Sequence, residues 1–273
     1  MHKAFIAQAR MTSNRLPGKV GKDICGEPAL YRMIERLRLT RHEDMDIIIA
    51  TTTNHQDDIV EKIALECGVK VFRGSENHVL SRYYYAAKEY GVDVICRVTC
   101  DDLLIDPRWL FDDLMDEFIQ DGTYDYMNGM SFNPETSSWE DNEPSCGCQT
   151  EIFTFKAIER CMNETDNPYC TEHVTPYIYM NPDLFRCGGH GSGYNGVNIA
   201  PLKYGTSLDT QEDLQLLRNI YEELYPVNPK FGILDIIESY QSHPEWVDII
   251  ADISRTPVTY HGEGDKNTQW KGY

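Results

Sequence analysis

Apolar and polar positions along the first 120 residues predict strands and helices in turn. Short apolar runs, typical of buried strands, cover residues 3–9, 46–52, 69–72 and 93–99. Segments with apolar residues at helical spacing follow them at 28–40, from Asn54 or His55 to Gly68, at 79–90 and at 107–120. This alternation indicates an α/β fold, doubly wound around a mostly parallel sheet with right-handed crossovers.

The alternation ends near residue 126. Residues 130–150 are rich in Ser, Asn, Glu and Pro and show no clear period, which favours a long loop or lid. Further along, we expect a strand at 151–155 and helices at 156–162, 171–180, 210–224 and 231–240. Residues 188–196 contain five glycines in nine positions, and a plain hairpin loop is favoured there over a loop that approaches a ligand.

Composition limits the classes of protein that remain. The 273 residues are 41% hydrophobic and 25% charged, as in an ordinary globular protein. A net charge of −19 argues against nucleic acid as a partner, because nothing would offset phosphate repulsion. No apolar run is long enough to span a membrane and the N-terminus lacks a signal-peptide pattern, so we expect a cytoplasmic protein. The nine cysteines are odd in number and lack zinc spacing, so we expect small buried thiols.

Three cations follow the first predicted strand within a short polar run. They are Arg10, Arg15 and Lys19, and the run also contains Ser, Asn, Pro and Gly, which are typical of loops. A loop at the carboxyl end of a first parallel strand is where α/β proteins bind ligands. Backbone N–H groups and three cations suit a polyphosphate. The alternative is a basic surface loop that pairs with acids elsewhere.

Carboxylates from two distant segments are expected near this loop. Asp101 and Asp102 follow the strand at 93–99, on the same sheet edge, and suit Mg²⁺ bound together with substrate phosphates. The alternative role for such acids is a turn or a helix cap, and Asp106 before a proline fits that role. In the segment SLDTQEDL, a capping box explains Thr210 and leaves Asp209 without a structural task. The candidate metal ligands are therefore Asp209 together with Asp101 or Asp102.

These residues resemble the SpsF-type cytidylyltransferases, a group related to acylneuraminate and KDO cytidylyltransferases. The resemblance depends on seven segments in the same order: QARMTSNRLPGKV, GEPAL, ATTTNHQDD, VFRGSENHVLSRYYYAAKEYG, RVTCDDLLIDP, TEHVTPYIYMNPDLF and SLDTQEDL. They run from residue 4 to about residue 217. The resemblance implies a Rossmann-like nucleotidyltransferase in which a hydroxyl or acid oxygen of an acceptor attacks the α-phosphate of CTP. The products would be a CMP-linked compound and pyrophosphate.

The resemblance also assigns roles by position. The nucleotide would be bound by the backbone around Ala7, Gln8 and Ala9 at the base and by Arg10, Arg15, Lys19 and Asp101 at the triphosphate. Arg10, Lys19 and Asp101 are the expected catalytic residues, and Asp101 and Asp209 would bind the Mg²⁺ cofactor. Residues 126–200 resemble an inserted segment that closes the acceptor pocket and supports dimerisation. We therefore expect one domain over 1–273, with this insertion, and a homodimer.

The sequence departs from the family pattern at several positions near the acceptor or the metal. Cys100 replaces a glycine, Leu103 a proline, Gln149 an aspartate in the lid pattern, and Thr171 an arginine. Because the triphosphate and metal positions are kept, the resemblance predicts nucleotide transfer and leaves the acceptor open. It also leaves open whether the changes at Cys100, Leu103 and Gln149 alter or abolish the family activity.

The acceptor is expected to be small and anionic: an acidic sugar, or a phosphonate or phosphate compound. Its candidate binding residues are Arg73, Arg82, Gln149, Glu151 and His173, with Arg97 a further candidate for the anionic group. For Arg82 and Arg97 the alternative is packing or pairing with acids, and for His173 a structural role in its helix.

Two other functions remain possible from the sequence. A glycosyltransferase would also use a nucleotide, a metal and paired acids on a similar α/β core, but it would consume a sugar nucleotide and need fewer cations. A non-catalytic nucleotide-binding homologue would bind CTP and form no product with any acceptor.

Overall fold

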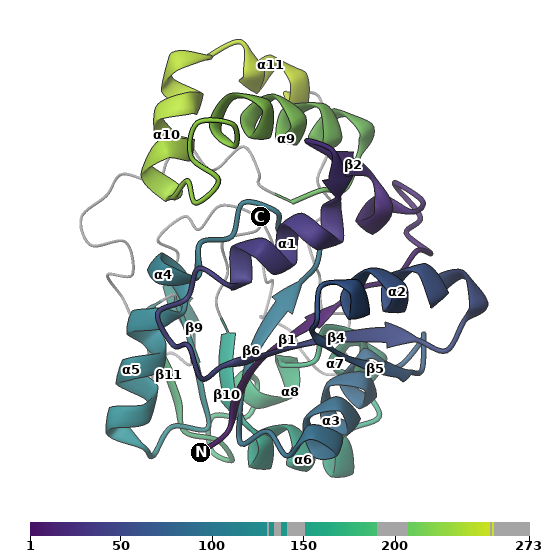
Figure 1. The fold of residues 1–273 in the computed structure, drawn as a ribbon. Coiled ribbons are helices and arrows are strands. Elements are labelled where there is room, and N and C mark those ends of the chain that lie inside the picture. Colours follow the sequence, from purple (N-terminus) through teal and green to yellow (C-terminus); the bar gives the residue numbers. More distant parts are fainter. Residues whose placement is uncertain (130, 134–137, 141–150, 190–206, 252, 254–273) are drawn as a thin grey trace.

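The computed structural model describes residues 1–129, 131–133, 138–140, 151–189, 207–251 and 253. Its centre is a seven-stranded sheet in the order β11-β7-β10-β6-β1-β4-β5 (Figure 1). The strands of this sheet are β1 (Lys3–Gln8), β4 (Asp46–Thr52), β5 (Lys70–Gly74), β6 (Val94–Thr99), β7 (Tyr126–Asn128), β10 (Glu151–Thr154) and β11 (Cys187–Gly189). Two small hairpins pair β2 (Asp23–Ile24) with β3 (Glu27–Pro28) and β8 (Ser131–Asn133) with β9 (Ser138–Glu140).

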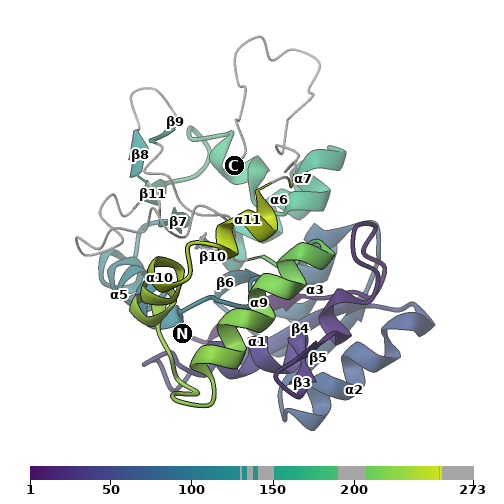
Figure 2. The same cartoon turned by 90° about the horizontal axis from the view of Figure 1, so that it is seen from above.

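Helices cover both faces of the sheet. They are α1 (Ala29–Leu37), α2 (Asp58–Glu66), α3 (Val79–Tyr90), α4 (Pro107–Leu110), α5 (Asp112–Asp121), α6 (Phe155–Glu164), α7 (Pro168–His173), α8 (Pro176–Tyr179), α9 (Gln211–Leu224), α10 (Ile233–Ser242) and α11 (Trp246–Ile250), with 3₁₀ turns η1 (Lys19–Gly21) and η2 (His55–Asp57). Alternate residues of β1 divide the core: Phe5 and Ala7 pack with α1, α2, α5, α9 and α10, whereas Ala4 and Ile6 pack with α3, α6 and α8. Figures 1 and 2 show α9 to α11 stacked outside α1.

The strand order creates a topological switch point between β1 and β6. The chain moves outward from β1 to β4 and then β5, and returns to the other side of β1 as β6, all four strands being parallel. Gln8 at the end of β1 lies opposite Thr99 at the end of β6. In open α/β sheets, ligands bind beyond the carboxyl ends of the strands at such a point. The loops after Gln8 and Thr99 are therefore where a site is expected.

The predicted alternation of strands and helices is confirmed, and the mostly parallel, Rossmann-like α/β sheet with it. β4 and α3 have the predicted bounds. Two predicted helices are each divided. The segment 107–120 breaks at Phe111, whose ring packs edge-on against Phe5 at a centroid distance of 5.1 Å. The segment 171–180 breaks at Val174, which has φ 76°, and Pro176 starts α8.

Parts of the segment 126–200 join the main sheet. β10 runs antiparallel to both β6 and β7, and β11 runs parallel to β7. Within the predicted lid at 130–150, residues 131–133 and 138–140 form the β8–β9 hairpin. The rest of the lid, including Gln149, lies outside the described residues, as does most of the glycine-rich stretch. The described cysteines are free thiols, and five of them are buried. Among the described residues, no helix has both the length and the apolar character needed to cross a bilayer.

Candidate active site

The loop after β1 places Lys19 by means of a left-handed turn. Gly18 has φ 69°, a conformation that L side chains rarely adopt, and it precedes the 3₁₀ turn that begins with Lys19. Gly18 N–H donates to the carbonyl of Met11 at 2.9 Å, which closes the loop. The N–H of Met11 in turn donates to the buried carboxylate of Asp57 at 2.6 Å. The loop is thus fixed at both ends before any ligand binds.

Lys19 joins the two acids that the sequence predicted as metal ligands. Its Nζ lies 2.5 Å from Asp101 Oδ2 and 2.8 Å from Asp209 Oδ1. Burial by itself lowers the pKa of Lys19, but the two carboxylates outweigh it and the pKa is raised. Burial raises the pKa of Asp101, but the Lys19 ammonium outweighs it and lowers the pKa below its usual value. Three charges therefore meet at one point, from segments up to 190 residues apart in the sequence.

Asp209 reaches this point through a short connection between two chain segments. Ser207 forms an isolated antiparallel bridge with Asp102, and its hydroxyl donates to Asp102 Oδ1 at 2.6 Å. The N–H of Leu208 donates to the carbonyl of Asp101 at 2.8 Å. Burial, together with the neighbouring Asp101 carboxylate, raises the pKa of Asp102 to about 7. Asp102 thus fixes the segment that carries Asp209. The sequence did not predict this role, because no local pattern links residues 102 and 207.

The other two predicted cations also contact carboxylates. Arg15 Nη2 lies 2.9 Å from Asp209 Oδ2, and Arg10 Nη1 lies 3.6 Å from Glu76 Oε1. Glu76 also accepts a hydrogen bond from the hydroxyl of Thr12 at 2.5 Å. The loop does pair with acids, as the alternative interpretation supposed, but for Arg15 the acid is one of the two candidate metal ligands.

A cavity of about 270 Å³ opens beside this cluster. The predicted site residues that line it are Gln8, Ala9, Arg10, Arg15, Lys19, Arg82, Asp101 and His173, and Arg97, Thr99 and Cys100 line it as well. Ala7 is buried inside β1 and does not line the cavity. The cavity is rich in cations although the whole chain is strongly acidic, so its chemistry suits an anionic ligand.

Two candidate acceptor residues lie elsewhere. Arg73 does not line the cavity, because its guanidinium donates to the carbonyls of Thr52 and Asn54 and forms ion pairs with Asp58 and Glu61 near α2. We therefore no longer assign Arg73 to the acceptor.

Glu151 is the second correction. Its side chain is buried and does not line the cavity; it pairs with Arg97 across the antiparallel β10–β6 register. The sequence predicted direct acceptor contact, but the structure places Glu151 behind an arginine that does line the cavity.

The number and type of donor groups decide which metal ion the candidate ligands suit. Among the described residues, no group of three or more His, Cys, Asp or Glu side chains could hold a metal ion. Asp101 and Asp209 nevertheless bring two carboxylates to a single cation, the Lys19 ammonium. Mg²⁺ keeps several waters and is usually bound by one or two carboxylates plus substrate phosphates. The donor set therefore fits Mg²⁺ bound with a polyphosphate and does not fit an all-protein zinc site.

A parallel sheet whose switch point presents clustered cations and two converging carboxylates defines an α/β protein of the nucleotide-binding class. The chain matches the family described as cytidylyltransferase over residues 4–230, and it belongs to that family. It is therefore an enzyme of the nucleotidyltransferase class. The family supports CTP as its substrate and transfer of CMP as its reaction.

Individual relatives agree with this assignment. A Methanocaldococcus jannaschii protein named as uncharacterized protein MJ1063 is 37% identical over 254 residues, covering 91% of this chain and 94% of that protein. Spore coat polysaccharide biosynthesis protein SpsF of Bacillus subtilis is 29% identical over 222 residues, covering 80% and 86%. The solved structure of a cytidylyltransferase from Leptospira borgpetersenii serovar Hardjo-bovis (strain JB197) superposes with a TM-score of 0.77 at 31% identity, covering 94% of this chain and 99% of that one.

Proposed function

We propose that this enzyme transfers CMP from CTP to a small anionic acceptor and releases pyrophosphate, in the synthesis of a precursor for a surface polysaccharide or other glycoconjugate. The observation that carries the proposal is the convergence of Lys19, Asp101 and Asp209 beside a cation-lined cavity at the β1–β6 switch point. The name of the SpsF relative supports the polysaccharide context.

The cations of the first loop are proposed to bind the triphosphate. Arg10, Arg15 and Lys19 all line the cavity, and each contacts a carboxylate in the structure described. Phosphate oxygens form stronger, charge-assisted hydrogen bonds with such groups than neutral partners do. When Mg²⁺ and a triphosphate bind together, the metal would occupy Asp101 and Asp209 and leave Arg15 and Lys19 to phosphate oxygens, and the same cations would stabilise the pyrophosphate as it leaves.

Asp101 and Asp209 would hold Mg²⁺ when CTP binds. The ion would neutralise phosphate charge and polarise the phosphoryl oxygens of the nucleotide. Lys19 then has two tasks that follow from its position: it keeps the two acids together without a ligand, and it offers its ammonium to a phosphate when the acids take up the metal.

The acceptor is proposed to bind at the wall formed by Arg82 and Arg97, with His173 beside them. Burial, followed by the charge of Arg97, lowers the pKa of His173, so its imidazole is neutral near pH 7 and can donate or accept a hydrogen bond. The predicted homodimer and the lid around Gln149 belong to the same proposal.

Of the four departures from the family pattern, Gln149 for an aspartate and Thr171 for an arginine each remove a charge, whereas Cys100 and Leu103 do not add one. Cys100 and Leu103 are both buried, and burial raises the pKa of the Cys100 thiol well above its usual value, so neither position adds a charge. No feature of the described residues favours a glycosyltransferase or a non-catalytic homologue over the proposed transferase.

The proposal is tested first by nucleotide binding, because that step does not require the acceptor to be known. We expect CTP with Mg²⁺ to raise the melting temperature more than ATP, GTP or UTP. At one hundred times the dissociation constant the stabilisation is about 2.7 kcal/mol. Lys19→Ala should remove this stabilisation, whereas Lys62→Ala, an exposed lysine on α2, should leave it intact.

Catalysis is tested by pyrophosphate release from CTP and Mg²⁺ with a panel of sugar acids and phosphorylated or phosphonate compounds. Asp101→Asn and Lys19→Ala should abolish release with whichever acceptor supports it. Full activity in either variant would contradict the proposal, and CMP or UDP release from a sugar nucleotide would favour the glycosyltransferase.

A further inference from the structure

Two arginines of the cavity wall share an unusual hydrogen-bond pattern. The bonds found for Arg82 all leave from Nη1, to the carbonyls of Ser75 and Glu76 at 2.5 and 3.0 Å. Arg97 likewise uses Nη1, which donates to Glu151. In both side chains the Nε atom is buried and has no partner among the described residues. Within the described residues, each guanidinium thus has one engaged corner, and no bond is found at its Nε–Nη2 edge.

Buried polar atoms without a partner are concentrated at this cavity. Five such side-chain atoms occur in the described part of the chain, and three belong to residues that line the cavity: Gln8, Arg82 and Arg97. Native proteins satisfy nearly all of their buried polar groups, so each exception needs an explanation. A ligand oxyanion would supply acceptors to the two arginine Nε atoms, whereas Gln8 Oε1, itself an acceptor, would need a donor group from a ligand.

The charge balance at Arg82 points to an anion. The residue is 2% exposed, and no ion pair is found for it within the described residues. Burial, and the nearby charge of Arg10 among smaller effects, lowers its pKa. An unpaired buried cation is unfavourable unless a counter-ion arrives.

Arg97 is held in place from behind. Glu151 Oε2 pairs with Arg97, while Oε1 accepts hydrogen bonds from the Tyr126 hydroxyl at 2.8 Å and the Thr175 hydroxyl at 2.5 Å. Both oxygens of Glu151 are therefore occupied, and the carboxylate cannot turn away from Arg97. This arrangement fixes the guanidinium before any ligand binds, which is what a specific recognition group requires.

We propose that the Nε–Nη2 edges of Arg82 and Arg97 bind the oxyanion of the acceptor, a carboxylate or a phosphate, and that Glu151 is the positioning residue for Arg97. The proposal rests on the proposed function for the existence of an acceptor. The Nε–Nη2 edge of a guanidinium matches two oxygens of a planar carboxylate or a phosphate. Arg82 is carried by α3, which packs on the face of the sheet opposite Val20 of the Lys19 turn, and Arg97 is carried by β6.

The experiment observes the arginine Nε–H signals directly by ¹H–¹⁵N NMR. The full-length protein is saturated with CTP in EDTA, so that no turnover occurs, and titrated with pyruvate or with methyl phosphate. Hydroxyacetone, the neutral counterpart of pyruvate, is the matched control ligand. The internal control is Arg36, a buried arginine away from the cavity whose Nε already donates to the carbonyl of Ile105 at 2.8 Å.

We expect at least one oxyanion to shift the Arg82 and Arg97 signals with a single dissociation constant. The Arg36 signal should not move, and hydroxyacetone should shift none of them. Arg82→Lys and Arg97→Lys keep the charge but lose the paired N–H donors of the guanidinium. Each should therefore weaken binding of the oxyanion by about tenfold or more. Glu151→Gln leaves Arg97 buried without its ion-pair partner and is therefore titrated at a temperature where the variant is folded; it should weaken oxyanion binding too and broaden the Arg97 signal, while the Arg82 signal stays near its wild-type position.

Two results would overturn the proposal. One is that CTP alone shifts both signals and neither oxyanion shifts them afterwards, which would assign the arginines to the triphosphate. The other is that neither oxyanion moves them at all. Because these readouts are made on the wild-type protein, they do not depend on whether a variant folds. Failure of the proposed function would look different, since CTP would then not raise the melting temperature whatever the arginine signals do.

Discussion

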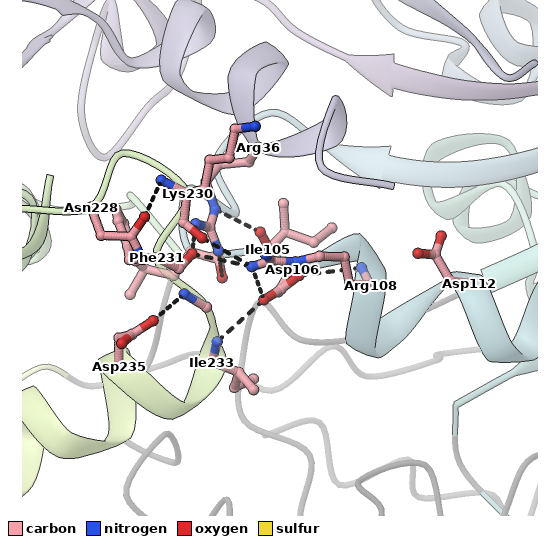
Figure 3. A network of polar contacts seen from close by, with 12 residues as sticks. Arg36, Ile105, Asp106, Arg108, Asp112, Asn228, Lys230, Phe231, Ile233 and Asp235 are labelled. Atoms are coloured by element: carbon pink, nitrogen blue, oxygen red, sulfur yellow. Dashed lines mark hydrogen bonds and ion pairs between the residues drawn. The ribbon is translucent and has the colours of Figure 1, made fainter. Parts of the chain in front are cut away.

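Arg36 and Arg82 are both buried arginines, but their surroundings differ in a way that separates structure from binding. Arg36 Nε donates to the carbonyl of Ile105 at 2.8 Å, Nη1 to that of Phe231, and Nη2 to that of Leu104 at 3.4 Å (Figure 3). Every nitrogen of this side chain has a carbonyl partner. Within the described residues, Arg82 donates from Nη1 alone, and it lines a cavity.

The network around Arg36 joins three parts of the fold. Figure 3 shows the chain after β6 beside the start of α10, with Arg36 reaching in from α1. Asp106 caps α4 and also accepts from the N–H of Ile233 at 3.2 Å, which links the C-terminal helices to the sheet. The comparison teaches that burial of an arginine does not identify a ligand site. What identifies it is an incomplete set of partners beside an open volume.

The largest expected effect on stability concerns Arg97, which has a buried partner, as Arg36 has, and lines the cavity, as Arg82 does. Arg97→Met should lower the free energy of unfolding by about 3–5 kcal/mol, because Glu151 would remain buried with its charge unpaired. The double variant Arg97→Met/Glu151→Gln should recover most of this loss, since neither charge then remains. Urea denaturation of both variants measures the difference. Equal losses in the single and double variants would contradict the ion-pair explanation.

Arg36→Met is expected to be the next largest change. It leaves three carbonyls without their donor, and we expect a loss of about 3 kcal/mol in unfolding free energy. CTP binding, measured at a temperature where the variant is folded, should remain at the wild-type level because Arg36 does not line the cavity. A variant that folds normally but binds CTP poorly would remove the distinction between the two regions.

Arg82→Met should have a small effect on stability. The substitution leaves the carbonyls of Ser75 and Glu76 without their donor but also removes a buried cation that has no ion pair in the described chain. Because these two effects oppose each other, the free energy of unfolding should change by less than about 1 kcal/mol. Binding of an oxyanion to CTP-loaded protein should nevertheless be lost. Paired denaturation and titration experiments check both halves, and a destabilisation as large as that of Arg36→Met would show that Arg82 is structural.

The smallest expected effect is a pH dependence at His173. Burial, and then the charge of Arg97, lowers its pKa in the folded state, with Glu172 and Glu151 acting in the opposite direction. The unfolded chain therefore binds the proton more readily, and stability falls as pH drops below the unfolded value of about 6.5. For one group the slope cannot exceed about 1.4 kcal/mol per pH unit. His173→Gln should flatten the stability profile between neutral and mildly acidic pH, and an unchanged profile would contradict this origin.

Much of the fold was predictable because its strands are buried on both faces. A continuous apolar run such as 46–52 has few alternatives to a parallel strand, and β4 has those bounds. The convergence of Lys19 with Asp101 was predictable for a related reason: in a parallel sheet the loops after the strands all leave from one edge. Asp209 was a candidate because the capping box leaves it without a structural task, and the resemblance to cytidylyltransferases favoured Asp101 over Asp102, but no local pattern gives Asp209 its position in space.

The parts of the candidate site that could not be predicted depend on contacts between side chains of different elements. Arg73 and Arg82 are nine positions apart and equally cationic in the sequence, but α2 presents Asp58 and Glu61 to Arg73 and not to Arg82. Glu151 faces Arg97 because β10 runs antiparallel beside β6, a pairing that reverses the direction of the rest of the predicted sheet. These outcomes follow from tertiary packing and strand order, which local periodicity does not contain.

The bridge between Ser207 and Asp102 has a consequence for the order in which the site forms during synthesis. During synthesis, β1, β4, β5 and β6 emerge long before the segment that delivers Asp209. A nascent chain that stops short of residue 207 has the Lys19 loop and Asp101 but only half of the acid pair. On the proposed assignment, the acid pair is therefore complete only when residues 207–209 have docked beside Asp101 and Asp102, after β1, β4, β5 and β6 have emerged.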